Sequence, residues 1–489
     1  MKIKILTITI LLNLALTATC FAATYYISPS GNNSSNGTTE ATSWKTFSKA
    51  FSTMGGGNEL VLLDGTYSEA AGTGYISYLG TNSAQPPSGT SLSAMTVVRA
   101  KNPGSVTVNG PLCLGRSTRK DSYIKIQGIK FEGGESGLYN ASYCTIKDCG
   151  FHGELQDGGG VFGIGTNDGE WGNSYNLIED CWIWGKNRII ASNYRADYNV
   201  WRRVVVRGDG CNTGACTGSG NPNVGITIYD STGVSFQNVI VIDRTLGGGE
   251  PYADFATAQH TDGAHFLGPN EWLGCISLKA PDGGTNFEAD NTNNNTTTVR
   301  NMVIWGSGAD GINIGAAHRN ITLENITAGQ IAENTIRVAP EVTTGVVRNI
   351  IAYNAGHWGI NSAIAPSYCD VYGSVDEPYN QTTCTTGCKT TNPLSDGSPA
   401  SLKYLLRIET GSALKGTGYN GGDYGANVLK RYGTDGARYG GVHRFCRDAG
   451  PARRPRGCDG GAAGGSFPRS CRQVRGRADA GRAGCAGAP

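Results

Sequence analysis

The segments TTVRNMVI (297–304), NITLENITA (320–328) and GVVRNIIA (345–352) repeat one short phrase, in which apolar and polar residues alternate around an asparagine. Alternation with a period of two is typical of a half-buried β-strand. Earlier copies can be found back to residue 123, at intervals of 20 to 37 residues. One apolar position of the phrase falls on Ile126, Ile146, Ile178, Trp201, Phe236, Leu273, Val299, Leu323 and Val347. The chain is therefore built from short repeated units.

A second alternating segment follows the later copies of the phrase. Its copies are VGITIYD (224–230), DGAHFLG (262–268), GTNFEAD (284–290), DGINIGA (310–316), NTIRVAP (334–340) and WGINSAI (358–364). A unit of two short strands cannot bury an apolar face alone, whereas stacked units can. No helical period separates the strands, which argues against folds that alternate strands with helices. We therefore expect an all-β protein, a single-stranded right-handed parallel β-helix in which each unit forms one coil.

One polar position of the phrase is almost constant in type. It is occupied by Asn238, Asn301, Asn325 and Asn349, and in earlier copies by Asp148 and Asp180. Asparagine tolerates the backbone of tight turns, and its amide is both a donor and an acceptor. We expect these side chains to stack at one corner of the coils and to form hydrogen bonds along the axis.

The two ends of the chain differ from its middle. Lys2 and Lys4 precede a short apolar run and small residues, which predicts a cleaved signal peptide over residues 1–23 and an exported, extracellular or periplasmic protein without a membrane span. Residues 441–489 are rich in Arg, Gly and Ala, cannot build a core, and are interpreted either as a disordered low-complexity tail or as the product of a different reading frame. Without these two ends, 29 basic and 36 acidic residues remain, a net charge of −7 that argues against nucleic acid as a partner.

Fifteen cysteines in an exported chain suggest some disulfides. Cys384 is predicted to pair either with the nearby Cys388 or with Cys369. By contrast, Cys144, Cys149 and Cys181 fall inside strand patterns and are interpreted as buried thiols.

The segments TYYISPSGNNSSNGTTEATSWKTFSKAF (24–51) and NELVLLDGTYSE (58–69) resemble the N-terminal cap of secreted right-handed parallel β-helix proteins of the pectin-lyase-like superfamily, especially family 9 polysaccharide lyases. The resemblance covers residues 24–375 and implies a short amphipathic helix that plugs the open end of the solenoid. Trp44, Phe47 and Phe51 have the spacing of its apolar face. Residues 376–440 are expected to run along the solenoid or to close it.

Alternation within the second segment places a column of side chains on the outer face of the β-helix. The column would contain Thr227, His265, Asn286, Asn313, Arg337 and Asn361. The longest turn, residues 244–262, adds Tyr252 beside it, and long turns are where solenoids place function. We predict that a polysaccharide lies along this column, bound by a monomer through Thr227, Asn286, Asn313, Asn361 and Tyr252.

Uronate lyases, to which the resemblance points, must neutralise the substrate carboxylate and then remove the adjacent proton. Carboxylates that would hold Ca²⁺ for the first task are Asp254, Asp262, Asp282 and Glu288. Candidates for the base are His265, Arg337 and Lys279. No segment matches the motif around the catalytic lysine of these lyases, so the choice stays open among the three.

Other interpretations compete with a Ca²⁺-assisted β-elimination lyase. A non-catalytic extracellular protein that binds carbohydrate or mediates adhesion would use the same face. A glycoside hydrolase, the third possibility, needs two carboxylates around the scissile bond. Asp310 precedes a glycine, as Asp262 does, and both positions are also explained by turn chemistry. The tryptophans at 171, 182, 184, 305 and 358 are either sugar-stacking platforms or packing residues, and packing is the commoner use on solenoid strands.

Overall fold

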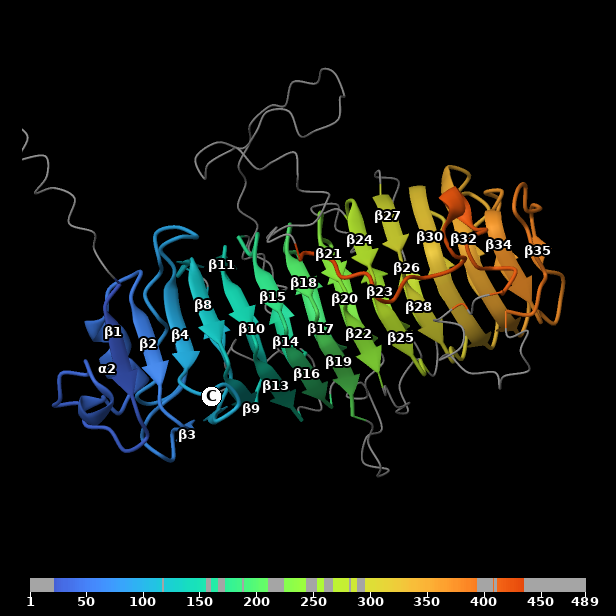
Figure 1. Ribbon diagram of the computed structural model, residues 1–489. Coiled ribbons are helices and arrows are strands. Elements are labelled where there is room, and N and C mark those ends of the chain that lie inside the picture. Colours follow the sequence, from blue (N-terminus) through green and yellow to red (C-terminus); the bar gives the residue numbers. More distant parts are fainter. Residues whose placement is uncertain are drawn as a thin grey trace, which may run out of the picture.

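The protein forms an elongated stack of coils (Figure 1). The computed structural model describes residues 22–116, 118–154, 160–165, 172–186, 189–209, 224–242, 253–258, 267–280, 283–287, 295–393, 408 and 411–434. Every pairing between the strands of its two large sheets is parallel, and each strand pairs with its counterpart in the next coil. The predicted fold class, an all-β parallel β-helix with a short capping helix, is therefore confirmed.

Each full coil contributes three strands. Strands of the first and second rows belong to one 22-stranded sheet, and those of the third row form a separate 11-stranded sheet, called the third sheet below. The first row consists of β1 (Thr24–Ile27), β2 (Glu59–Leu62), β4 (Thr96–Ala100), β8 (Ile124–Gln127), β12 (Thr145–Lys147), β15 (Leu177–Glu179), β18 (Val200–Arg202), β21 (Ser235–Gln237), β24 (Asn270–Leu273), β27 (Asn295–Arg300), β30 (His318–Ile331), β32 (Gly345–Ala355) and β34 (Ser367–Tyr372).

The second row consists of β3 (Gly65–Ser68), β5 (Val106–Asn109), β9 (Lys130–Glu132), β13 (Gly150–Gly153), β16 (Trp182–Gly185), β19 (Val205–Gly208), β22 (Ile240–Ile242), β25 (Ile276–Leu278) and β28 (Val303–Trp305), and continues into the second halves of β30 and β32. The third sheet consists of β6 (Cys113–Leu114), β10 (Ser136–Leu138), β14 (Phe162–Ile164), β17 (Ile189–Tyr194), β20 (Val224–Tyr229), β23 (Ala253–Ala258), β26 (Gly283–Phe287), β29 (Ile312–Ile314), β31 (Ile336–Val338), β33 (Ile360–Asn361) and β35 (Tyr379–Asn380). Short strands β7 (Asp121–Ser122) and β11 (Ala141–Ser142) pair separately.

The corner between the first and second rows has a left-handed backbone in successive coils. Residues with positive φ there are Gly128, Asp148, Asp180, Arg203, Asn238, Gly274, Asn301, Asn325 and Asn349. Only glycine adopts this conformation without steric cost, and Asn and Asp tolerate it better than most residues. The predicted stacking of the asparagine position at one corner is confirmed, and Asn349 Nδ2 donates to Asn325 Oδ1 at 2.7 Å along the axis.

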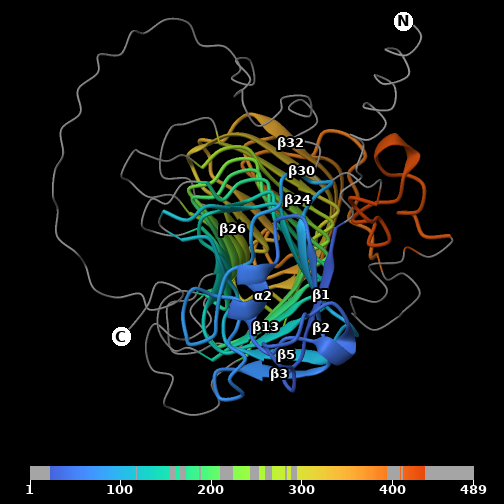
Figure 2. The same ribbon diagram turned by 90° about the vertical axis from the view of Figure 1, so that its left-hand side faces the viewer.

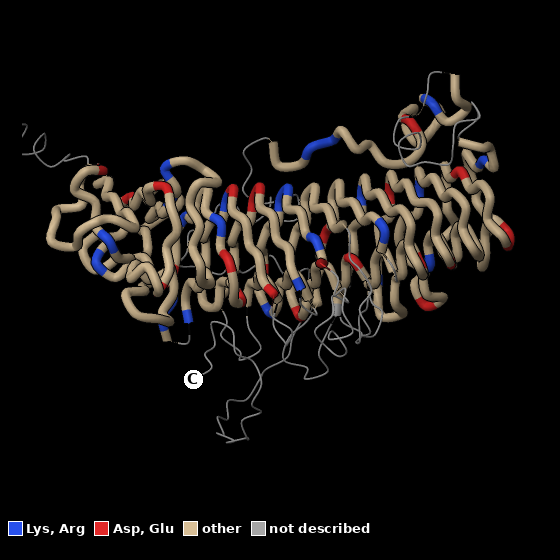
Figure 3. Tube along the Cα trace, turned by 90° about the horizontal axis from the view of Figure 1, so that it is seen from below, with Lys and Arg blue, Asp and Glu red and all other residues tan. Residues whose placement is uncertain are grey.

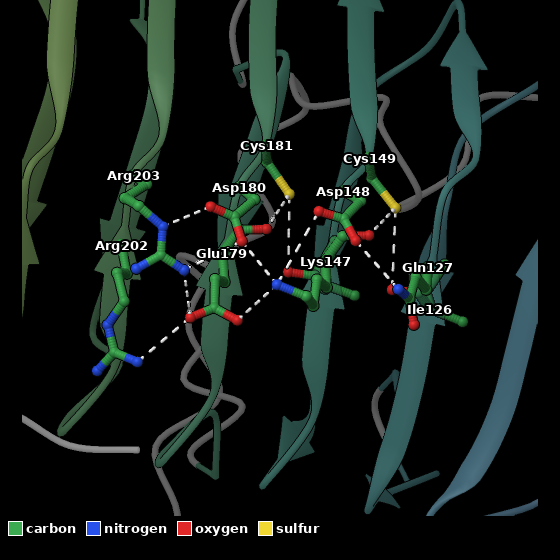
Figure 4. Close-up of polar contacts among 11 residues, drawn as sticks. Ile126, Gln127, Lys147, Asp148, Cys149, Glu179, Asp180, Cys181, Arg202 and Arg203 are labelled. Atoms are coloured by element: carbon green, nitrogen blue, oxygen red, sulfur yellow. Dashed lines mark hydrogen bonds and ion pairs between the residues drawn. The ribbon is translucent and has the colours of Figure 1, made fainter. Parts of the chain in front are cut away.

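In the earlier coils, ion pairs take over at this corner (Figure 4). Lys147 Nζ lies 3.0 Å from Glu179 Oε2 and 2.6 Å from Asp180 Oδ2. Arg203 approaches the same two carboxylates from the following coil, with Nη2 at 2.7 Å from Glu179 Oε1. Hydrogen bonds from these cations lower the pKa of Glu179 and Asp180 against the opposing effect of burial, which is the largest influence on both groups. Both carboxylates are thereby kept charged.

The strand register corrects one position of the sequence alignment. Phe236 pairs with Trp272, and Trp272 pairs with Val299, so Trp272 rather than Leu273 belongs to the inward column. Gly274 occupies the left-handed corner, two residues after Trp272, as Asn301 is two residues after Val299. The alignment failed there because this coil carries glycine where its neighbours carry asparagine.

Aromatic and aliphatic side chains fill the interior of the coils. Phe131 stacks on Phe151 with ring centroids 5.2 Å apart. Further along the axis the buried aromatics are Phe162, Trp201, Phe236, Phe255, Trp272 and Phe287, all within 2% exposure. Units that are too small to fold alone thus share one continuous apolar core.

A short helix covers the first coil, as expected (Figure 2). It is α2 (Phe47–Thr53), which begins after Thr46, whose hydroxyl accepts a hydrogen bond from the amide of Lys49 at 3.1 Å. Phe47 and Phe51 are buried in the core, as the spacing predicted. Trp44 is also buried, but it precedes the helix and stacks on Tyr25, so its assignment to the helix face is wrong.

The segment 411–434 lies along the outside of the large sheet (Figure 1). Leu414 and Tyr424 pack with Ile351 and Tyr353 in a small separate cluster. From there the segment follows the asparagine corner back through earlier coils, because Asn427 and Tyr432 contact coils that precede β30. Two short 3-10 turns, Glu40–Thr42 and Tyr419–Gly421, complete the regular structure of the described residues.

Cysteine pairing follows the shorter of the two sequence alternatives. Cys384 is bonded to Cys388, and Cys369 is a free buried thiol. Cys144, Cys149 and Cys181 are likewise buried thiols outside any disulfide, as predicted. Among the described residues, no helix has the length and apolar character needed to cross a membrane.

Candidate functional site

The outer face of the third sheet carries the column that the sequence predicted. Its register runs through Ser192, Thr227, Ala256, Asn286, Asn313, Arg337, Asn361 and Asn380. Along each strand, the residues on either side of a column member point inward. Ile312 and Ile336, for example, are completely buried. Parallel strands hold equivalent side chains one strand spacing apart, about 4.8 Å. The backbone therefore fixes a regular row of polar groups.

Hydrogen bonds join three consecutive members of the column and, separately, its last two members. Asn313 Nδ2 donates to Asn286 Oδ1 at 3.0 Å, and Arg337 Nη1 donates to Asn313 Oδ1 at 3.3 Å. Asn361 Oδ1 accepts from Gln381 Nε2 at 2.6 Å and from Asn380 Nδ2 at 3.4 Å. We call Asn286, Asn313, Arg337 and Asn361 the outer ladder.

Arg337 carries the single charge of the outer ladder. Its side chain is 53% exposed, although Nη1 lies 3.8 Å from Asp310 Oδ2. Asp310 precedes β29, and its Oδ1 accepts from the amide N–H of Asn334 at 3.0 Å and from Asn334 Nδ2 at 2.7 Å. Burial raises the pKa of Asp310, while the hydrogen bonds from Asn334 oppose that rise. Asp310 thus orients the guanidinium of Arg337, which still presents N–H donors to the solvent.

Asp310 and Asn334 are residues that sequence reasoning did not place in the site. Asp310 had been interpreted as turn chemistry, and its bonds to Asn334 in the next coil agree with that role. Its second oxygen, near Arg337, adds a positioning role. The signal was available in principle, because Asp310 and Asn334 are each three residues before a member of the outer ladder.

The position predicted for His265 is occupied by another residue. Ala256 of β23 pairs with Thr227 on one side and with Asn286 on the other. The sequence predicts a long turn that contains residues 253–258, and a strand in the following segment DGAHFLG. The segment ADFATA (253–258) also has apolar residues at alternate positions. It forms the strand β23 at the place predicted for DGAHFLG. His265 itself lies outside the described residues.

Asp254, a predicted Ca²⁺ ligand, faces the interior. It is completely buried, and its Oδ2 accepts from Ser277 Oγ at 2.7 Å. Gly225 and Gly284 lie beside it in the neighbouring coils, where an added Cβ would come within 2.5 Å of interior aliphatic side chains. The prediction placed Asp254 in the long turn of residues 244–262, whereas the structure places it in β23. At the corner, this position points into the solenoid, so Asp254 is removed from the outer face.

The remaining predicted residues are dispersed. Lys279 is exposed at the corner after β25, with a left-handed backbone, and is not part of the outer ladder. Thr227 is in the column but only 4% exposed. Tyr252, Asp262, Asp282 and Glu288 lie outside the described residues. The structure therefore brings together Asn286, Asn313 and Arg337, with Asn361 in the next coil.

A Ca²⁺ site on the described residues would require several carboxylates that lie close together. Calcium prefers six to eight oxygen ligands, several of them carboxylates. In the part of the chain that the structure describes, no three His, Cys, Asp or Glu side chains gather in a way that could hold a metal ion. Among the described carboxylates, Asp310 contacts the outer ladder, and Arg337 already lies against it. These residues do not fit the ion, and no chemical step is derived through it.

Charges of both signs are interspersed over the described coils (Figure 3). No long stretch of one sign dominates the tube. Specific recognition of an acidic ligand would therefore depend on single cations such as Arg337 rather than on a broad field.

Comparison with known proteins identifies no family model and no curated protein that matches this sequence. Solved structures with a similar course include the pectate lyase Pel9A, at 16% identity and a TM-score of 0.43 over 67% of this chain and 79% of that one. A family 6 polysaccharide lyase from Pseudopedobacter saltans is 12% identical, with a TM-score of 0.47 over 69% and 90%. The A-module of the mannuronan C-5 epimerase AlgE6 from Azotobacter vinelandii is 11% identical, with a TM-score of 0.44 over 69% and 92%.

Proposed function

We propose that the protein is an exported, monomeric polysaccharide lyase that binds a uronate-containing chain along the outer ladder and cleaves it by β-elimination. The observation that carries the proposal is the hydrogen-bonded row Asn286–Asn313–Arg337, which places an exposed guanidinium among amides on a rigid parallel sheet. Amide groups suit sugar hydroxyls, and a guanidinium suits a carboxylate because its planar fork donates two parallel hydrogen bonds.

Arg337 has the first task in this reaction. Pairing with the substrate carboxylate withdraws negative charge and makes the proton on the neighbouring carbon more acidic.

A base then accepts the proton from C5. The electron pair forms the C4–C5 double bond, the bond from C4 to the glycosidic oxygen breaks, and the departing oxygen takes up a proton. The sequence offers His265, Arg337 and Lys279 as bases. Because Arg337 pairs with the carboxylate in this proposal, Lys279 and His265 are left for this role, and separate alanine variants discriminate between them. Retained activity in both variants would remove both from this role. Ca²⁺ held by Asp262, Asp282 and Glu288 stays a separate proposal.

The experiment measures the ultraviolet absorbance of the new double bond. Pectate, alginate and glycosaminoglycans are each incubated with the wild-type protein and with Arg337→Ala, in the presence and absence of a calcium chelator. The proposal predicts absorbance on at least one acidic polymer and its loss in Arg337→Ala. No absorbance on any polymer would exclude a lyase, and saturated reducing ends among the products would identify a hydrolase. Loss of absorbance with the chelator alone would support the calcium proposal.

A second candidate function has an observation of its own. The outer ladder consists of amides and one cation, and such groups bind sugars without carrying out chemistry. A non-catalytic carbohydrate-binding or adhesion protein would retain binding to an acidic polymer while producing neither unsaturated nor saturated new ends.

A further inference from the structure

A cleft of about 670 Å³ opens on the outer face of the second row, away from the third sheet. Its lining includes Lys130 of β9, Gly150 of β13, Trp182 and Trp184 of β16, and Arg207 of β19. Trp182 and Trp184 are two positions apart on one strand, so both indoles leave the sheet on the same side. The cleft thus combines two aromatic rings with polar groups from neighbouring coils.

Trp182 is the most informative member of this surface. Its side chain is 42% exposed, and it is the one aromatic residue among the large hydrophobic side chains that are exposed in the described ranges. In the coils around it, the other large aromatics of the core are buried. An indole left in water keeps its apolar face accessible, so Trp182 can contact a ligand that enters the cleft.

Trp184 is held in place by its surroundings. Its ring stacks on His152 with centroids 5.2 Å apart and an interplanar angle of 13°, and Lys130 Nζ lies 5.5 Å from the ring centroid. His152 Nδ1 is in turn 2.6 Å from Glu132 Oε2. A ring that is fixed before binding loses little conformational entropy when a ligand arrives.

Gly150 leaves the space in which the Trp184 ring lies against the sheet. It has no positive φ, so its backbone would accept other residues. A Cβ at this position, however, would lie 3.3 and 3.4 Å from the Trp184 ring and 3.6 Å from Lys130 Cγ. The absence of a side chain therefore forms part of the cleft.

The charges at the cleft are balanced. Lys130 and Arg207 provide two cations, and Asp148 and Asp180 provide two carboxylates, all of them lining the cleft and 29 to 42% exposed. Such a set offers donors and acceptors to hydroxyl groups without a net preference for an anion. Flat indole faces suit the C–H faces of a pyranose ring, as in apolar ligand sites with a few convergent polar groups.

We infer that the Trp182–Trp184 cleft is a second carbohydrate-binding site, which takes a neutral pyranose chain. It is separate from the outer ladder, because β9, β13, β16 and β19 belong to the other sheet. The inference does not rest on the proposed lyase activity: binding of a neutral glycan anchors the protein to a matrix whether or not the outer ladder is catalytic.

Calorimetric titration of the full chain with hexasaccharides of β-1,4-linked xylose, glucose and mannose tests this site, with hexagalacturonate as the acidic comparison. At least one neutral hexasaccharide is expected to bind with Kd between about 0.1 and 1 mM. Trp182→Ala should raise that Kd about tenfold or more, which corresponds to the loss of one stacking contact. Leu429→Ala, at another exposed apolar side chain, is the matched control and should leave Kd unchanged.

A second variant keeps both indoles and changes only the floor of the cleft. Gly150→Val suits a β-strand but pushes against the Trp184 ring, and it should also weaken binding at an unchanged melting temperature. Absence of binding by every neutral hexasaccharide, or unchanged binding in Trp182→Ala, would overturn the inference. Binding of hexagalacturonate that depends on Trp182 would overturn the neutral assignment. Trp182→Ala is expected to cleave acidic polymers at the wild-type rate. This result would show that the loss of neutral binding is independent of the proposed lyase activity.

Discussion

Asparagines form two rows on this protein, and the two rows have different surroundings. At the corner between the first and second rows of strands, Asn238, Asn301 and Asn349 bind the protein's own segment 411–434. On the third sheet, Asn313 bonds to Asn286 and Arg337 in adjacent coils, and the guanidinium beyond them is 53% exposed.

The difference shows that repetition of a residue type does not by itself indicate a binding site. The corner asparagines are required by a left-handed backbone, and their amides are used within the chain. Those of the outer ladder lie on extended strands, where the backbone makes no such demand. Their side chains are therefore better candidates for contact with a ligand. We expect variants of the corner asparagines to lower stability, and variants of the outer ladder to lower activity.

Arg337→Ala should have the largest effect on activity. Loss of the group that neutralises the substrate carboxylate is expected to lower kcat/KM about a thousandfold, or about 4 kcal/mol of transition-state stabilisation. The melting temperature should stay the same, because the side chain is half exposed. Arg319→Ala, at another exposed arginine, is the control, and equal losses in both variants would disprove a specific role for Arg337.

Asp370 should make stability depend on pH at the end of the solenoid where segment 411–434 begins. Burial raises the pKa of Asp370 to about 6 from 3.8, and its Oδ2 has no hydrogen-bond partner among the described residues. The folded state then binds more protons than the unfolded state between these two values, so stability falls as pH rises from about 4 to 6. The loss reaches about 3 kcal/mol above pH 6.

Asp370→Asn removes this titration. The free energy of unfolding of the variant, measured with urea at several pH values, should exceed that of the wild type by an increasing amount between about pH 4 and pH 6. A constant difference across that range would show that Asp370 does not titrate as proposed.

Asn349→Ala should lower stability without affecting catalysis. Asn349 Oδ1 accepts from the amide N–H of Tyr419 at 3.2 Å, and Nδ2 donates to Asn325 and to the carbonyl of Asp423. Losing these bonds and placing alanine at φ 56° should cost about 2 kcal/mol in the free energy of unfolding. Asn349→Gly retains the backbone freedom, so the difference between the variants separates the two contributions. Equal loss of activity in Asn349→Ala and Arg337→Ala would contradict the different roles of the corner asparagines and the outer ladder.

Asn313→Ala should have the smallest effect of the series. One hydrogen bond to a sugar is expected to be worth about tenfold in KM, or about 1.4 kcal/mol. Its kcat should change little if Asn313 binds substrate and transition state equally. A tenfold loss of kcat with constant KM would instead place Asn313 at the reacting centre.

Much of the fold was predictable because one period governs it. Alternation around a polar corner fixed the parallel β-helix, the stacked asparagines and the inward column. The errors occurred where a coil departs from the period: Gly274 replaces asparagine and displaced the alignment by one residue at Trp272. Similarly, two neighbouring segments of residues 253–268 both alternate, and the sequence offered no reason to prefer the first.

The candidate site was predictable in part. Asn286, Asn313 and Arg337 share a face because strand alternation is local. The direction of Asp254 was not predictable, since it depends on how closely a corner approaches Ser277 in the adjacent sheet. The contact between Arg337 and Asp310 joins two adjacent coils, so predicting it requires the strand register as well as the sequence.

A crystal structure of the protein with an acidic hexasaccharide tests the central claim most directly. The account predicts a sugar carboxylate on the guanidinium of Arg337 and hydroxyl groups on the amides of Asn286 and Asn313. An acidic chain bound elsewhere, with the outer ladder in contact with solvent alone, would contradict it.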